Sequence, residues 1–199
     1  PFSSVTSFMA RRRERSPRTT STNRTPCRLN SGTSVTFWPM NEDSAGITVR
    51  RGRVGFQYFG DATADSQINL RMLDIEPNQR SVLIAPLPNR AAGTKATINL
   101  DDSRLKGDVV IEAGGQAVTL GNLRTNQAAL KLGSTGGAIR VVDSVLDSST
   151  IATTGTAPVR VEASRFVNGT VTGTAGAPVT VQGCHLGGLT VGSHATSSN

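Results

Sequence analysis

A side-chain pattern recurs about every twenty residues through most of this 199-residue chain. Residues 157–167 read APVRVEASRFV and residues 177–187 read APVTVQGCHLG, so both segments carry Ala-Pro-Val followed by an alternating valine. A fixed period of about 20 to 50 residues is typical of architectures in which each unit buries its apolar face against the next unit. The repeat therefore predicts a stack of similar units.

The period can be followed by the first inward-facing residue expected in each unit. These anchor residues are Ile47, Ile68, Ile98, Val118, Ile139, Val159 and Val179. They are spaced by 21, 30, 20, 21, 20 and 20 residues, which indicates one insertion, around residues 76–90. Each anchor opens a run that alternates apolar and outward-facing residues, as a β-strand with one buried face does. Second runs of this kind lie at residues 109–111, 130–132, 150–152, 170–172 and 189–191.

Two or three short strands per unit, separated by Gly and Asn and without helical spacing, predict a parallel β-helix. In VRVEASRFVNGTV (159–171) and VTVQGCHLGGLTV (179–191) the sequence resembles the right-handed parallel β-helix (pectate-lyase-like) superfamily. The resemblance covers residues 95–199 well and 46–94 poorly, and implies an all-β fold of about five to six coils. That superfamily includes polysaccharide lyases, hydrolases, adhesins and phage tail proteins. A β-sandwich or jelly roll is the alternative, because short strands at similar spacing also suit those folds.

Charge and aromatic residues divide the chain at a different place from the repeat. Residues 1–53 contain ten arginines and three acidic residues, whereas residues 54–199 contain eleven basic and eleven acidic residues. All aromatic residues except Phe166 precede residue 60. We therefore predict three parts: an extended basic arm at 1–34, a β adaptor region with the first irregular coils at 35–94, and the parallel β-helix at 95–199.

The arm is too polar to form a core of its own, so a partner is expected to order it. Its arginines can neutralise an acidic protein surface or phosphates, and its aromatic residues can anchor an interface. The expected contact residues are Phe2, Phe8, Arg11, Arg12, Arg13, Arg15, Arg18, Phe37 and Trp38. A solvated tail is the alternative. Binding of single-stranded nucleic acid ranks lower, because the arginines and aromatic residues are largely separated.

Catalysis on a β-helix would require carboxylates clustered on one exposed face. Asp102 and Asp143 each follow an anchor residue by four positions, and Asn122 has the same phase. We therefore expect these three side chains to stack on one flank, with Asp147 nearby, as a candidate carbohydrate or ion ladder. The alternative is that they are ordinary corner residues, since Asp and Asn are common in turns.

The remaining chemical signals are few. Cys184 and His185 are adjacent on an expected strand, so they face opposite sides and are a poor pair for one metal ion. The two cysteines, Cys27 and Cys184, do not support a disulfide framework. No apolar run of about 18 residues and no secretory signal is found, so no membrane association is expected. We expect no enzymatic activity, no cofactor and no metal.

The leading functional hypothesis is a structural component of a large assembly. About five coils from Ile98 onward would form a rod about 25 Å long, which is short for a catalytic groove. The assembly is expected to be a virion, with a capsid-associated, cement, decoration or tail role, by analogy with phage β-helical proteins. Expected partners are further copies of the chain, in a trimer, and another structural protein of the assembly.

Two other classes of function remain open. One is a polysaccharide-binding or polysaccharide-cleaving β-helix outside the cell, which would require Asp102, Asp143 and Asp147 to face one exposed groove. The other is a nucleic-acid-binding protein that uses the arginine-rich arm, with binding that weakens steeply as salt rises.

Overall fold

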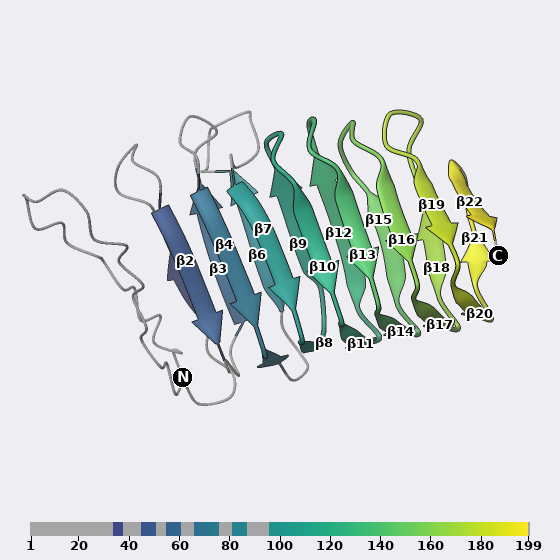
Figure 1. Ribbon diagram of the computed structural model, residues 1–199, viewed down its shortest axis with the longest axis horizontal. Helices are drawn as coiled ribbons and strands as arrows, with labels where there is room; N and C mark the ends of the chain where they lie inside the picture. The colour runs from purple at the N-terminus through teal and green to yellow at the C-terminus, as the bar shows by residue number, and fades with distance from the viewer. Residues whose placement is uncertain are drawn as a thin grey trace, which may run out of the picture.

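The structure is a computed structural model that describes residues 34–37, 45–50, 55–60, 66–75, 81–86 and 96–198. In these ranges the chain forms an all-β parallel β-solenoid, with about five regular turns of about 20 residues each from residue 96 onward and earlier strands that add to the same sheets (Figure 1). The predicted parallel β-helix is confirmed at the level of this architecture. Among the described residues, no helix has the length and apolarity needed to cross a membrane.

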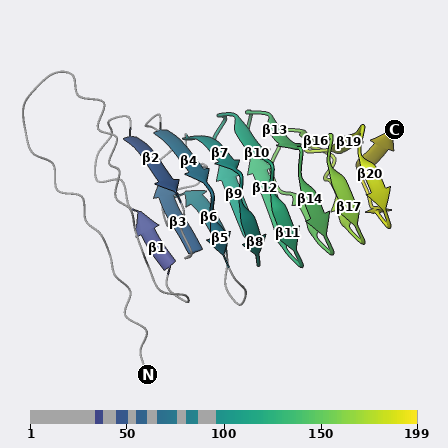
Figure 2. The same cartoon turned by 60° about the horizontal axis from the view of Figure 1, so that its bottom comes forward.

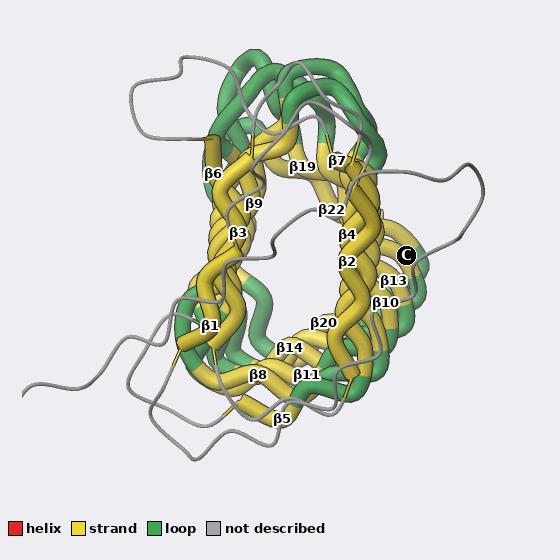
Figure 3. Tube along the Cα trace, turned by 90° about the vertical axis from the view of Figure 1, so that its left-hand side faces the viewer, coloured by secondary structure: helices red, strands yellow, loops and turns green. Residues whose placement is uncertain are grey.

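Three parallel sheets form the walls of the solenoid (Figures 2 and 3). Sheet A contains β1 (Ser34–Phe37), β3 (Gly55–Gly60), β6 (Val82–Pro86), β9 (Val109–Ala113), β12 (Ala129–Ser134), β15 (Thr150–Thr153), β18 (Thr170–Thr172) and β21 (Thr190–Val191). Sheet B contains β2 (Ala45–Arg50), β4 (Ser66–Arg71), β7 (Ala96–Asp101), β10 (Val118–Gly121), β13 (Ile139–Val142), β16 (Val159–Glu162), β19 (Val179–Gln182) and β22 (Ala195–Ser198). Sheet C contains β5 (Asp74–Ile75), β8 (Arg104–Lys106), β11 (Arg124–Asn126), β14 (Val145–Asp147), β17 (Arg165–Val167) and β20 (His185–Gly187).

The strand register matches the period of the sequence. Each anchor residue pairs with the anchor of the next coil, from Ile47 with Ile68 through to Val159 with Val179. The 30-residue interval between Ile68 and Ile98 contains two additions. The first lies between sheets B and A, where Ile68 and Val82 are 14 residues apart but their register partners Ile98 and Val109 are 11 residues apart. The second lies between β6 and β7. Strands β1–β6 of the predicted adaptor region pair within the same sheets as the later coils.

The core fills the space between the three walls. Alternate residues of sheets A and B point inward, and each short sheet C strand adds one central side chain. These central residues are Ile75, Leu105, Thr125, Leu146 and Phe166, all buried, and Leu186, which is partly buried. Thr125 is the polar member, and its hydroxyl forms a hydrogen bond with the buried Ser149 hydroxyl at 2.9 Å. Apolar contact therefore runs continuously along the axis.

Each coil turns sharply between sheets B and C, at a position we call corner 1. The first residue of corner 1 has a left-handed backbone, with φ between 47° and 59°. The residues at this position are Met72, Asp102, Asn122, Asp143, Ala163 and Gly183. Gly, Asn and Asp enter this conformation most easily, which explains why Asp and Asn recur at one phase of the repeat.

The second residue of corner 1 points inward and forms a column along the axis. It is serine in three coils, Ser103, Ser144 and Ser164, and Cys184 continues the column, while buried leucines, Leu73 and Leu123, take the position in the other two coils. The Ser144 hydroxyl donates to the Val142 carbonyl at 2.8 Å and accepts the Leu123 N–H at 3.1 Å. The Cys184 thiol likewise accepts the Ser164 N–H, at 3.3 Å. This column satisfies backbone groups that the turns leave without a ladder partner.

Replacing Ser144 with alanine is expected to lower the free energy of unfolding by about 1 to 3 kcal/mol, because a buried N–H and a carbonyl lose their partner. Urea unfolding followed by circular dichroism measures the loss. The control is Ser193→Ala, at an exposed turn position whose hydroxyl has no described hydrogen bond, with an expected change within about 0.5 kcal/mol. Equal costs for the two variants would contradict a stabilising role of the column.

Candidate functional site

Corner 1 carries the polar residues that the sequence singles out. Asp102, Asn122 and Asp143 take the same corner position in three successive coils, so their side chains follow one line along the axis. The Asn122 amide donates to Asp102 Oδ1 at 2.6 Å. Asp143 is exposed and has no side-chain hydrogen bond or ion pair within the described ranges. The line therefore contains one bonded pair and one unengaged carboxylate.

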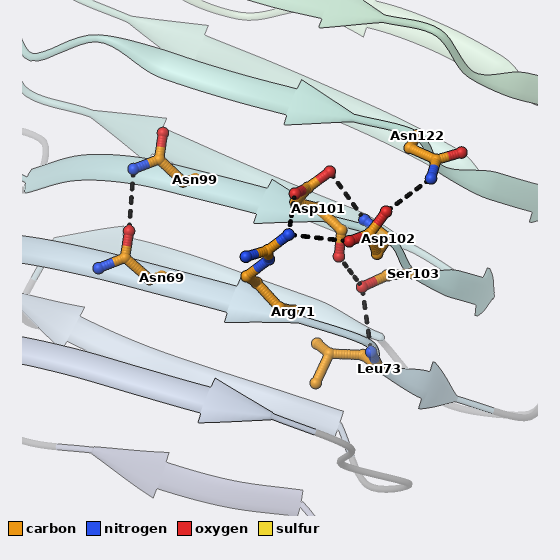
Figure 4. A network of polar contacts seen from close by, with 8 residues as sticks. All are labelled: Asn69, Arg71, Leu73, Asn99, Asp101, Asp102, Ser103 and Asn122. Atoms are coloured by element: carbon orange, nitrogen blue, oxygen red, sulfur yellow. Dashed lines mark hydrogen bonds and ion pairs between the residues drawn. The ribbon is translucent and has the colours of Figure 1, made fainter. Parts of the chain in front are cut away.

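Arg71, at the end of β4, extends the bonded pair into a network across three coils (Figure 4). Its guanidinium lies 3.0 Å from Asp102 Oδ2 and 3.1 Å from Asp101 Oδ2. Asn99 donates to the Asn69 side chain at 2.9 Å on the same outward face of sheet B. The polar groups here bind each other between coils.

The network shifts the ionisation of Asp102. The hydrogen bond from Asn122 lowers the pKa of the Asp102 carboxyl, and the hydrogen bond from Arg71 adds to the effect. Both donors favour the charged carboxylate, while desolvation opposes them. Because the pKa is lower in the folded chain, Asp102 contributes stability above its unfolded pKa and loses it as the pH falls.

Asp102→Asn is expected to destabilise the protein at neutral pH and to weaken the acid dependence of stability. The difference from wild type should be fully present above about pH 5 and disappear as the pH falls below the ordinary aspartate pKa of about 3.9. Unfolding midpoints at about pH 7 and pH 3 test this. Asp143→Asn is the matched control, since it has the same backbone conformation and no described side-chain partner. The same pH dependence in both variants would contradict the assignment.

Asp147 lies away from corner 1. It ends β14, whereas Asp143 precedes that strand. Its carboxylate accepts the Asn126 amide at 3.1 Å and the Ser148 hydroxyl at 2.9 Å. Asp147 thus belongs to a pair between neighbouring strands of sheet C. The residues of the predicted ladder therefore lie at two separate sites, corner 1 and sheet C.

A shallow depression lies where corner 1 meets sheet C. Its lining includes Asp143, Ala163 and Gly183 on one side and Val145, Arg165 and His185 on the other. It forms because Ala163 and Gly183 have little or no side chain at the corner position. Of the predicted ladder residues, Asp143 belongs to this lining, and Asp102, Asn122 and Asp147 do not. A carboxylate, a guanidinium and an imidazole can hydrogen-bond a polar surface ligand here, without enclosing it.

Cys184 and His185 face opposite sides, as strand alternation predicts. Cys184 is buried in the serine column, and His185 is exposed at the depression. Across the described residues, no group of three or more His, Cys, Asp or Glu side chains is placed to hold a metal ion.

The predicted arm cannot be compared with the structure. Phe2, Phe8, Trp38 and the five arginines from Arg11 to Arg18 lie outside the described residues, and Phe37 ends β1. The arm therefore stays a prediction.

Arg71 and Arg165 were not among the residues singled out from the sequence. Arg71 follows its anchor Ile68 by three positions, and Asp101 has the same phase after Ile98, so the two are register partners. A comparison of the charged residues that lie the same number of positions after each anchor residue would have found this pair. Arg165 lies on a strand of three residues, which is too short to show alternation.

Comparison of the chain with protein-family models, with curated proteins and with solved structures gives no match.

Proposed function

We propose that this protein is a non-enzymatic structural component of a large assembly. The observation that carries the proposal is the use of outward polar side chains as links between successive coils. Four such links are Arg71 with Asp102, Asn122 with Asp102, Asn126 with Asp147, and Arg140 with Glu162. These side chains bind side chains of the next coil along the solenoid axis, and such links are the arrangement expected of a stiff spacer.

The interior supports the same role. Parallel ladders and a continuous apolar core connect every coil to the next, and the serine column adds hydrogen bonds between several of them. In a solenoid, such nearest-neighbour contacts supply most of the stability. A rod of this kind holds the partners bound at its ends or faces at a fixed separation.

The charge distribution supports docking through the arm. The net charge of +7 resides in residues 1–53, while the remainder of the chain is neutral. A basic segment with aromatic anchors suits an acidic surface on another protein of the assembly. We propose a virion as the assembly, with a capsid-associated, decoration or tail role. This part rests on the resemblance to phage β-helical proteins.

A polysaccharide-binding role is the second candidate. The depression with Asp143, Arg165 and His185 favours it, since these side chains offer both hydrogen-bond donors and acceptors on an open surface.

The mass of the full-length chain in solution, measured by light scattering, tests the assembly role. The test variant replaces Arg11, Arg12, Arg13, Arg15 and Arg18 with glutamine. The matched control makes the same change in charge on the coils, by replacing the exposed Arg104, Lys106, Arg124, Lys131 and Arg160 with glutamine.

We expect the wild type and the control to form one defined oligomer and the arm variant to give a smaller folded species. If all three proteins are the same stable monomer, the assembly role fails. Binding of a neutral glycan array, lost in Arg165→Ala, would then favour the second candidate.

A further inference from the structure

We draw no further inference here: the strongest candidate, the shallow depression lined by Asp143, Arg165 and His185 where corner 1 meets sheet C, belongs to the site already described.

Discussion

Replacement of Gly137 with alanine is expected to destabilise the protein by about 3 kcal/mol or more, enough to unfold a marginal chain. An added Cβ would lie 1.9 Å from the Gln116 carbonyl oxygen and 2.2 Å from its carbon. These are backbone atoms of the preceding coil, so no side-chain rotation relieves the clash. The two loops would have to separate, and the ladders beside them would be disturbed. Urea unfolding, with circular dichroism as the readout, measures the effect.

The neighbouring glycine supplies the control. At Gly136, an added Cβ would meet its nearest heavy atom, the Gly115 Cα, at 3.7 Å, an ordinary van der Waals contact. Gly136→Ala should therefore change the free energy of unfolding by no more than about 0.5 kcal/mol. If both variants unfold at the same urea concentration as wild type, the loops of successive coils do not stack as closely as the structure places them.

Phe166→Ala is expected to cost about 3 to 5 kcal/mol, because it removes the largest sheet C side chain from a closely packed core. Phe166 is fully buried at the centre of β17, between Leu146 and Leu186 of the adjacent coils. An alanine there leaves a cavity that the rigid ladders on either side cannot close. Thermal and urea unfolding should both show the loss.

Two further variants show whether the effect arises from buried volume. Phe166→Leu matches the residue of the neighbouring coils and should cost less than Phe166→Ala, about 1 to 2 kcal/mol. Val145→Ala removes an exposed side chain from the next strand of the same sheet and should cost about 0.5 kcal/mol or less. A loss in Val145→Ala as large as that in Phe166→Ala would show that the effect is not specific to the core.

The stacking of coils was predictable from the sequence, because strands that pair in parallel in successive coils must be separated by nearly the same number of residues. Val118, Ile139, Val159 and Val179 recur at intervals of 20 or 21 residues, and they are direct register partners. The phase argument also placed Asp102 and Asn122 at one corner, where their side chains are bonded. Both results depend only on counting residues along a regular repeat.

The third sheet was only partly visible in the sequence. Its strands have two or three residues, and each contributes one inward side chain, which is too little to show a period of two. The serine column was also missed, because a serine in a turn is usually taken as an exposed residue. Its phase, five positions after the anchor in Ser103, Ser144 and Ser164, is the signal that could have revealed it.

By itself, the sequence determined the class of fold and the register of the coils, since an alternating pattern at constant spacing can bury its apolar face only against its own next copy. The tertiary structure alone decided which polar groups meet. Arg71 and Asp102 are 31 residues apart, across an insertion that interrupts the count, and they contact because the loops leave the sheet register intact. It also decided that Val191, with the same pattern as Val171, is 40% exposed, because β21 has a partner on one side only among the described strands. Burial depends on the neighbouring coil, which the local pattern does not specify.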